Sequence, residues 1–346
     1  MRRARRRHAR ALPARRPRGQ ARARRRGAAL TRYGEAGVSL RKAEDVVGRL
    51  RAAVESTRGE RVVGELGGFA GLFALDEDRL LAATTDGVGT KLILSRRAGR
   101  LSDAGIDLVA HCANDVLTTG AEPLFFLDYA AAGSLDLDEI AELVDGAASA
   151  CRDAGCAILG GETAELPGIY REGELDFAGT MVGLVRRGDL VDGSRCRVGD
   201  AVLGLPSAGL HANGFTLVRS LLGDGPFDAD LLLPPTRLYL DDVRALRARC
   251  DVRALAHVTG GGIAGNLARV LPAGLGARID PLSWERPPVY AWLDGQGVPE
   301  DEQRRVFNLG VGYCAVVPGA DAARAGFPAI GRLEEGIAGV AWADER

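Results

Sequence analysis

Residues 79–91 read RLLAATTDGVGTK. The first seven residues are mostly apolar, which predicts a strand, and the last six form a polar turn rich in glycine. Upstream, Ser39 precedes apolar residues that recur at roughly helical spacing as far as Val54, and the stretch from Gly64 to Leu75 contains four glycines. The pattern predicts a helix, then a glycine-rich loop, then a strand that ends in a polar turn.

Segments with helical and strand patterns alternate along the rest of the chain. We expect helices over 106–119, 137–153, 214–222, 239–249 and 263–270, and strands over 124–129, 156–159, 175–185, 200–205, 276–279 and 311–317. A polar, turn-rich stretch from Gly188 to Gly199 divides the chain. The alternation indicates an α/β protein of the α+β type, with an N-terminal domain over 33–190 and a C-terminal α/β domain over 191–346.

The charge of the chain is distributed unevenly. The formal net charge is -1, but residues 1–26 contain 13 Arg and no acidic residue, so the remainder is acidic. Such a tail is compatible with nucleic-acid binding or with a disordered extension over 1–32 that takes no part in the chemistry. The tail has no aromatic residue to stack on bases and no apolar period, which favours the extension. A start codon assigned too far upstream would explain it equally well.

The cysteines and the apolar runs indicate the kind of protein to expect. Six cysteines occur without a CxxC pair, so a zinc site is not expected. A chain of 346 residues with 46% hydrophobic residues can bury a core without disulfides, and we expect reduced thiols in a cytoplasmic protein. Charged residues interrupt every apolar run, so no membrane-spanning helix is expected.

Four polar loops together predict a phosphate site. They are DGVGTK (86–91), ND (114–115), GGETAELPG (160–168) and HVTGGG (257–262). Glycines let backbone amides approach an anion, a lysine neutralises the anion, and carboxylates bind Mg²⁺. No stretch matches the Walker pattern GxxxxGK[ST] or the dinucleotide fingerprint. Each loop alone could also be an ordinary tight or capped turn.

The ordered set of motifs resembles the phosphoribosylformylglycinamidine cyclo-ligase (aminoimidazole ribonucleotide synthetase) family over about residues 33–335. The resemblance is carried by runs such as TTDGVGTK, GAEPLFFLDYAA, GGETAELPGIY, SAGLHANGFTLVR and HVTGGG. It implies the two-domain architecture of this ATP-dependent superfamily, in which the N-terminal domain binds ATP and Mg²⁺ and pairs in a homodimer. It also implies ring closure of formylglycinamidine ribonucleotide in purine biosynthesis, after ATP phosphorylates the formyl amide oxygen.

The resemblance further implies roles for individual residues. Asp86 and Asp115 would bind Mg²⁺, and Lys91 would contact phosphate. The nucleotide would lie against Gly67, Gly68, Phe69, Gly87 and Asn114. Glu162 and Thr163 would position the amide or the metal-bound phosphates, and His257 would lie near the phosphoryl acceptor. The ribose phosphate would bind at His211, Asn213, Gly214 and Gly261, where a helix begins and free backbone amides favour an anion. For His257 and His211 a purely structural role in a loop remains the alternative.

Other classes of protein compete with this interpretation. Sister enzymes of the superfamily, selenophosphate synthetase and thiamine monophosphate kinase, would share the fold, and the amidotransferase of the preceding purine step is much longer. The run GGETAELPG favours the cyclo-ligase. A nucleic-acid-binding protein built on an inactive enzyme is disfavoured because Asp86, Lys91 and Asp115 are all present.

Overall fold

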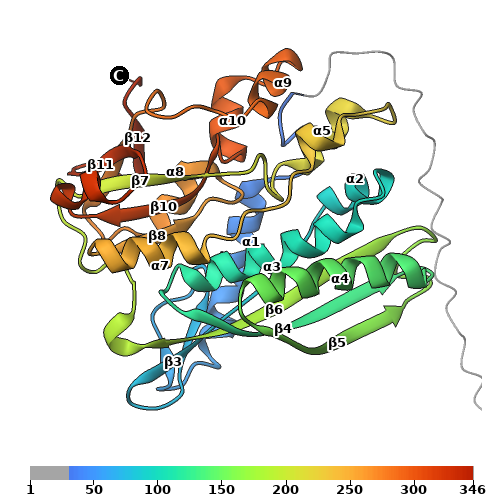
Figure 1. Ribbon diagram of the computed structural model, residues 1–346, viewed down its shortest axis with the longest axis horizontal. Helices are drawn as coiled ribbons and strands as arrows, with labels where there is room; N and C mark the ends of the chain where they lie inside the picture. The colour runs from blue at the N-terminus through green and yellow to red at the C-terminus, as the bar shows by residue number, and fades with distance from the viewer. Residues whose placement is uncertain (1–30, 346) are drawn as a thin grey trace, which may run out of the picture.

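Two six-stranded sheets form the framework of the protein. The computed structural model describes residues 31–345, and the predicted extension over 1–32 lies almost entirely outside these residues. The first sheet has the order β1-β2-β3-β6-β4-β5 and the second the order β12-β9-β11-β7-β10-β8. In Figure 1 helices α3, α4 and α7 lie in a layer between the two sheets. The predicted α/β fold of the α+β type is confirmed.

The first sheet comes from the N-terminal half. Its strands are β1 (Val62–Val63), β2 (Gly71–Ala74), β3 (Arg79–Gly87), β4 (Glu122–Ala132), β5 (Ala157–Glu165) and β6 (Leu175–Arg186). All strand pairs are antiparallel except β4 with β5. The helices of this half are α1 (Leu40–Glu55), α2 (Lys91–Arg97), α3 (Leu101–Leu117) and α4 (Leu137–Asp153). A short 3-10 helix, Arg187–Asp189, follows β6.

Helices α3 and α4 cover one face of the first sheet. In β6 alternate residues are buried beneath them, including Phe177 and Met181, as the period of two in a strand requires. The two helices approach each other closely at Gly105 and Gly146. A Cβ atom at Gly146 would lie 1.9 Å from the carbonyl oxygen of Ser102, so only glycine fits there. The glycines therefore set the spacing of the helix layer.

The second sheet comes from the C-terminal half. Its strands are β7 (Ala201–Pro206), β8 (Ala254–His257), β9 (Leu275–Ile279), β10 (Val311–Val317), β11 (Ala329–Glu335) and β12 (Val340–Trp342). Its α-helices are α5 (Phe215–Leu222), α6 (Ala229–Leu232), α7 (Leu240–Arg249), α8 (Gly262–Leu267), α9 (Val289–Gly295) and α10 (Glu300–Val306), and 3-10 helices span Ala268–Val270 and Gly319–Arg324. Every residue of β10 is buried, as expected for a central strand covered on both faces.

Most of the predicted elements occur where the sequence placed them. Helix α4 has the predicted bounds, and α1, α5 and α7 differ from prediction by one residue at an end. The prediction for 160–168 was partly wrong, because GGETAE continues β5 as far as Glu165 instead of forming a loop. Helix α2, which begins at Lys91, was not predicted. Along the chain, the proposed boundary between residues 190 and 191 lies after β6, the last strand of the first sheet, and before β7, the first strand of the second sheet.

Buried polar contacts join the two halves. The ammonium group of Lys91 donates a hydrogen bond to Asp107 at 2.9 Å and another to the carbonyl oxygen of Pro234 at 3.0 Å. The same carboxyl oxygen of Asp107 accepts hydrogen bonds from the backbone and hydroxyl groups of Thr236, both at 2.7 Å. The segment that follows β7 and α6 is thereby fixed to α3.

Candidate active site between the two halves

A cavity of about 380 Å³ lies between the two halves, where the motifs meet. Residues 86–90 of the DGVGTK turn line it from one half, and residues 212–216 and 259–260 line it from the other, together with Tyr33 and His111. The hydroxyl groups of Thr90 and Thr216 are 3.0 Å apart and link the two sides. The cavity therefore joins two of the four predicted loops, DGVGTK and HVTGGG, to the loop before α5.

Two histidine–aspartate pairs form the polar centre of this site. His111 Nε2 lies 3.0 Å from Asp86 Oδ2, and His257 Nδ1 lies 2.8 Å from Asp115 Oδ1. The two imidazole rings meet edge to face, with centroids 4.8 Å apart. Asp86 is the second-last residue of β3, His111 and Asp115 lie one turn apart on α3, and His257 is the last residue of β8. The predicted pair Asp86 and Asp115 is thus joined through two imidazoles.

Burial and pairing give the two histidines opposite protonation tendencies. Burial alone would lower the pKa of His111, but its hydrogen bond to Asp86 and the charge of that carboxylate raise the pKa to about 9. Burial lowers the pKa of His257, and the hydrogen bond to Asp115 does not offset it. Burial would raise the pKa of Asp86, yet its contact with His111 lowers it. The contacts therefore favour the cationic form of His111 and the neutral form of His257.

Lys91 and Asn114 do not reach the cavity. The Lys91 side chain is fully buried in its contact with Asp107 and is not among the residues that line the cavity. Asn114 donates to the carbonyl oxygen of Arg237 at 2.8 Å and accepts from the backbone of Tyr239 at 3.0 Å. Both side chains therefore fix the C-terminal half to α2 and α3, and direct contact of either with a nucleotide finds no support in this geometry.

The loop that precedes α5 forms the opposite wall. Asn213 and Gly214 line the cavity. Gly214 has a φ of 80°, and a Cβ atom there would lie 2.1 Å from the ring of Phe307, so this position requires glycine. His211 is 1% exposed and its Nε2 accepts a hydrogen bond from the backbone of Ala208, so it supports this loop from behind. Burial lowers its pKa well below the usual value.

Gly261 lies at the end of the other C-terminal loop. It has a φ of 99° and precedes α8 directly. The neighbouring residues Thr259 and Gly260 line the cavity, whereas Gly261 does not. Its left-handed backbone conformation turns the chain from the cavity wall into α8, which is a reason for glycine at this position.

The glycine-rich loop before β2 lies at a second cavity, of about 410 Å³. Gly67, Gly68 and Phe69 line it together with Arg269 from the C-terminal half. The guanidinium group of Arg269 lies 3.8 Å from the centroid of the Phe69 ring and donates hydrogen bonds to the carbonyl oxygens of Gly67 and Gly68. The contact is a cation–π interaction that holds the loop against the C-terminal half.

Glu162 and Thr163 lie apart from both cavities. They are exposed on β5, at the edge of the first sheet, and Glu162 is paired with Tyr129 of β4. Tyr129 pairs in turn with Ala178 of β6 and Ala178 with Gly87 of β3. Three strand spacings therefore separate Glu162 from Gly87, about 14 Å. The chain does not bring these two predicted residues to the cavity of its own DGVGTK turn.

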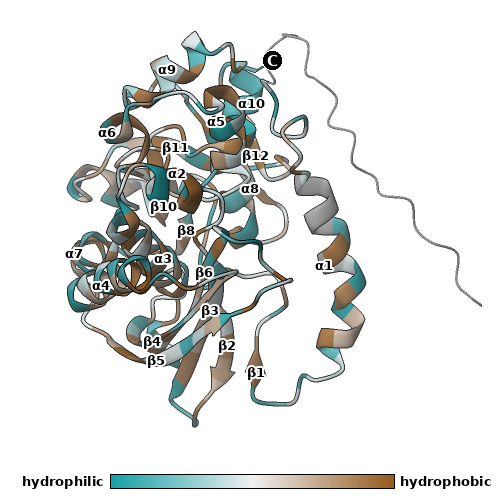
Figure 2. Ribbon diagram, turned by 90° about the vertical axis from the view of Figure 1, so that its right-hand side faces the viewer, coloured by the Kyte–Doolittle hydropathy of each residue, from teal (hydrophilic) through white to brown (hydrophobic). Residues whose placement is uncertain are grey.

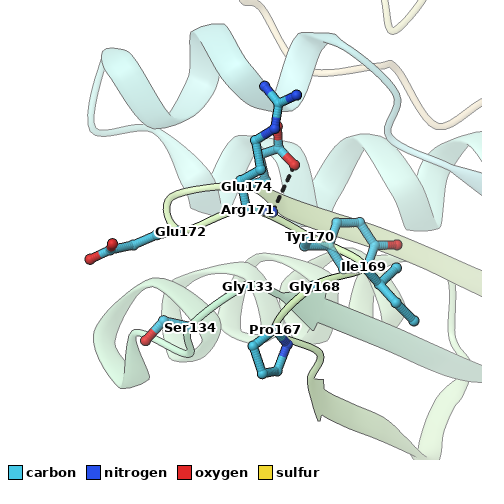
Figure 3. A pocket seen from close by; sticks show the side chains of 9 residues that line it. All are labelled: Gly133, Ser134, Pro167, Gly168, Ile169, Tyr170, Arg171, Glu172 and Glu174. Atoms are coloured by element: carbon cyan, nitrogen blue, oxygen red, sulfur yellow. Dashed lines mark hydrogen bonds and ion pairs between the residues drawn. The ribbon is translucent and has the colours of Figure 1, made fainter. Parts of the chain in front are cut away.

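A third cavity, of about 940 Å³, is formed by the connection between β5 and β6. Figure 3 shows its lining side chains, with the backbone of Arg171 bonded to the carboxylate of Glu174 at 2.9 Å and the side chain of Glu172 directed away. Pro167 and Gly168, at the end of the GGETAELPG run, also line it. It contains none of the predicted catalytic side chains.

His111 and Arg269 were not predicted as site residues. His111 is four residues before Asp115 in the sequence, which places both on one face of α3. Together with Asp107 and Asn114 they form a polar stripe at helical spacing among mostly apolar residues, and this stripe was a usable signal. Arg269 had no comparable signal, since arginine is frequent along the chain.

Comparison with known proteins agrees with this arrangement. The family model described as AIR synthase related protein, N-terminal domain, matches residues 67–185, and the corresponding C-terminal domain model matches residues 197–335. The phosphoribosylformylglycinamidine cyclo-ligase of Synechococcus sp. (strain CC9605) is 48% identical over 303 residues, which cover 83% of this chain and 88% of that protein. That of Sorangium cellulosum (strain So ce56) is 49% identical over 312 residues, 85% and 90% of the two chains.

The chain belongs to the phosphoribosylformylglycinamidine cyclo-ligase family. It is an enzyme, a ligase, and the resemblance inferred from its motifs is confirmed. The cyclo-ligase relatives disfavour the sister phosphotransferases as an alternative.

Solved structures agree with the cyclo-ligase fold. AaThiL complexed with AMPPCP and TMP matches with a TM-score of 0.64 at 16% identity, over 89% of this chain and 96% of that chain. Thiamine-monophosphate kinase from Stenotrophomonas maltophilia K279a matches with a TM-score of 0.60 at 22% identity, over 87% and 96%. In the described part of the cyclo-ligase chain, residues 31–345, no helix is long and apolar enough to cross a membrane.

Proposed function

We propose that this cyclo-ligase catalyses the ATP-dependent ring closure of formylglycinamidine ribonucleotide to 5-aminoimidazole ribonucleotide, ADP and phosphate, in de novo purine biosynthesis. The observation that carries the proposal is the cavity of about 380 Å³, which joins the DGVGTK turn to the loop before α5. One wall has carboxylate and imidazole groups, and the other has the backbone of a helix start. A substrate with a reacting amide at one end and a phosphate at the other matches these two walls.

The chemistry requires activation of the formyl amide oxygen, which is a poor leaving group. Transfer of the γ-phosphoryl group of ATP to this oxygen converts it into a good one. The ring nitrogen then attacks the formyl carbon, and the carbon–oxygen bond breaks to release phosphate. No covalent enzyme intermediate is needed, so the protein contributes mainly orientation and charge stabilisation.

Asp86 and Asp115 would hold the Mg²⁺ that accompanies ATP. Their carboxylate oxygens are the hard ligands that this cation prefers, and they lie on either side of the His111–His257 contact. The cation would supply positive charge next to the transferring phosphoryl group. His257, neutral and buried, would orient the Asp115 carboxylate and lie near the phosphoryl acceptor.

The nucleotide would lie over Gly87 and against the loop of Gly67, Gly68 and Phe69, which Arg269 holds in place. Lys91 and Asn114 would act by fixing the position of this half against the other, as their buried hydrogen bonds support. For these two residues, which the sequence analysis assigned to direct nucleotide contact, we therefore propose a positioning role.

The ribose phosphate would bind at Asn213 and Gly214, before the first turn of α5. His211 would position this loop from behind. Gly261 would shape the adjoining loop before α8. The proposal thus divides the substrate between the two halves of the chain, with the phosphate on the C-terminal side and the reacting amide near Asp86.

We also propose a homodimer in which the first sheets pair. The sheet face opposite α3 and α4 carries exposed apolar side chains, among them Phe73 and Leu127, and edge strand β5 exposes Leu159 at 63%. Figure 1 shows this face uncovered by helices. Helix α1, which Figure 2 shows beside β1 at the margin of the protein, also exposes Val46 and Leu50. A dimer would cover such apolar surface and give Glu162 and Thr163 a partner site to act on.

The proposed compartment is the cytoplasm, where the substrates of purine synthesis are made. All six cysteines are free thiols, five of them buried, as expected for a protein kept in a reducing environment.

Isotope labelling tests the reaction directly. Purified protein is mixed with ATP and substrate that carries ¹⁸O in the formyl group, and phosphate is analysed by mass spectrometry. We expect aminoimidazole ribonucleotide and ¹⁸O-labelled phosphate in equal amounts. Ring closure with unlabelled phosphate would contradict activation by phosphorylation, and phosphate transfer to another acceptor without ring closure would indicate a sister kinase. The matched control is Asp86→Asn, which should give neither product.

A further inference from the structure

The two histidine–aspartate pairs form a compact set of nitrogen and oxygen donors. His111, Asp115 and His257 are all buried, and each offers one ligand atom within 4.8 Å of the others. The fourth residue, Asp86, lies 3.0 Å from His111. Among residues 31–345, the histidine, cysteine and acidic side chains whose spacing could hold a metal ion are His111, Asp115 and His257.

The spacing of these donors matches that of ligands on one cation. Ligand atoms about 2.1 Å from a common ion lie about 3.0 Å apart when adjacent and about 4.2 Å apart when opposite. The two nitrogen–oxygen contacts measure 2.8 and 3.0 Å, and the ligand atoms of His111, Asp115 and His257 all lie within 4.8 Å of one another. These separations are within about 1 Å of those expected around one ion.

A second observation points to the same ligand. His111 is buried, its Nε2 contacts Asp86, and its Nδ1 has no hydrogen-bond partner. Buried polar atoms in proteins are normally paired, so an unpaired imidazole nitrogen beside carboxylates calls for an additional group. A divalent cation at this nitrogen, bound after His111 has lost its proton, would supply the partner that the protein does not.

We propose that Asp86, His111, Asp115 and His257 bind a divalent transition-metal ion of the Mn²⁺ to Zn²⁺ series through both imidazoles, more tightly than they bind Mg²⁺. The reason is ligand chemistry: Mg²⁺ takes oxygen ligands, whereas imidazole nitrogen favours Mn²⁺, Fe²⁺, Co²⁺ and Zn²⁺, with affinity rising along the series. The inference deepens the proposed function, because it shares Asp86 and Asp115 with the proposed magnesium site.

The ion would be accessible from the active-site cavity. Asp86 and His111 line the cavity, and the Asp86 side chain is 38% exposed, whereas His257 is buried behind them. Coordination positions on the cavity side would remain open to oxygen atoms of substrate or ATP, as in catalytic metal sites elsewhere. Once His111 has lost its proton to become a nitrogen ligand, the two carboxylates balance the charge of the divalent ion, and the buried site carries no net charge.

The test is metal binding to the full-length protein after treatment with a chelator. Co²⁺ and Mg²⁺ are titrated separately by calorimetry, and Co²⁺ binding is also followed by its visible absorption. We expect Co²⁺ to bind at least about tenfold more tightly than Mg²⁺. Pulsed electron paramagnetic resonance of bound Mn²⁺ should show coupling to imidazole nitrogen. Equal affinity for the two cations, or Mn²⁺ without nitrogen coupling, would overturn the proposal.

Variants assign the nitrogen ligands. His111→Gln should lower the affinity for Co²⁺ by about 10–100-fold and remove one nitrogen coupling, while the affinity for Mg²⁺ changes little. His257→Gln is the second variant, in case the first fails to fold by circular dichroism. His211→Asn is the matched control, because His211 is equally buried but lies outside the set and Asn tolerates its φ of 59°. Unchanged Co²⁺ binding in both glutamine variants would refute the proposal.

Failure of this inference is distinguishable from failure of the proposed function. Ring closure with Mg²⁺ but no preference for Co²⁺ would overturn the metal proposal alone. Nitrogen-ligated Co²⁺ without ring closure under any metal would overturn the proposed reaction alone.

Discussion

Replacement of Lys91 by methionine should destabilise the protein strongly, because it leaves a buried carboxylate without its counter-ion. The Lys91 ammonium lies 2.7 Å from Asp107 Oδ2 and donates to Oδ1 at 2.9 Å, and both side chains are fully buried. Oδ1 keeps two hydrogen bonds from Thr236 after the change. Oδ2 accepts no hydrogen bond and is balanced only by the ammonium charge.

The expected cost follows from the loss of one partner of a buried pair. Removing one member of such a pair costs about 3–5 kcal/mol, because the other charge stays buried and uncompensated. In the double variant Lys91→Met with Asp107→Asn, no charge remains, and the Asn oxygen can still accept from Thr236. Its cost should be nearer the loss of one or two hydrogen bonds, about 1–3 kcal/mol. The double variant should thus be more stable than Lys91→Met alone.

Urea unfolding of the two single variants and the double variant measures these differences in the free energy of unfolding. The KM for ATP is measured on the same preparations in buffer without urea, at a temperature at which all the variants are folded. A direct phosphate contact predicts the opposite pattern: Lys91→Met would keep wild-type stability and raise the KM for ATP, and Asp107→Asn would not rescue it. That result would refute the positioning role of Lys91.

Three further predictions concern the walls of the site. Asp115→Asn should reduce turnover, measured as ADP release, at least about 100-fold, because a neutral amide of the same size is a weaker cation ligand. Turnover at the wild-type rate would show that Asp115 is not part of the site. Gly214→Ala should destabilise the protein by about 2–4 kcal/mol through backbone strain and overlap with Phe307. Gly155→Ala, at the C-terminal cap of α4 with a φ of 68° and no neighbouring atom within 4 Å, should cost only the strain of about 1 kcal/mol. Equal costs in thermal unfolding would contradict the steric argument. Arg269→Ala should raise the KM for ATP several-fold with little change in stability, because the loop of Gly67, Gly68 and Phe69 loses its cation–π contact and its hydrogen bonds. An unchanged KM would show that this loop does not contact ATP.

The elements that the sequence predicted best are those with strong local signals. Helix α4 combines an Asp136 cap with a regular apolar period, and its N-cap side chain accepts hydrogen bonds from the backbone of Asp138 and Glu139. Strand β3 and its turn were equally clear. By contrast, Gly160 and Gly161 suggested a loop, since glycine is unfavourable in strands. In β5, however, a Cβ atom at Gly161 would lie 2.2 Å from the carbonyl oxygen of Asp128, so glycine allows the close pairing of the strands.

The side-chain roles were harder to predict because they depend on contacts between distant residues. Lys91 follows a glycine-rich turn, which is where a phosphate-binding lysine would stand, and only the fold reveals that its ammonium pairs with Asp107 beneath the surface. Likewise, nothing in the local sequence of Asn114 indicates that its amide anchors Arg237 and Tyr239, more than 120 residues away. Local motifs predict which segments form the site, but not which of their polar side chains make structural contacts instead of facing the cavity.

One face of α3 explains why binding groups and structural groups are mixed in this way. Asp107, His111, Asn114 and Asp115 recur at helical spacing on the buried helix and all face the C-terminal half. Asp107 and Asn114 fix the segment 234–239, and on the same helix His111 and Asp115 contact His257. Because one rigid helix carries both sets, a change that loosens the contacts of Asp107 and Asn114 also shifts His111 and Asp115 relative to His257. Loss of the Lys91–Asp107 pair should therefore weaken metal binding as well as stability, although neither residue touches the metal site.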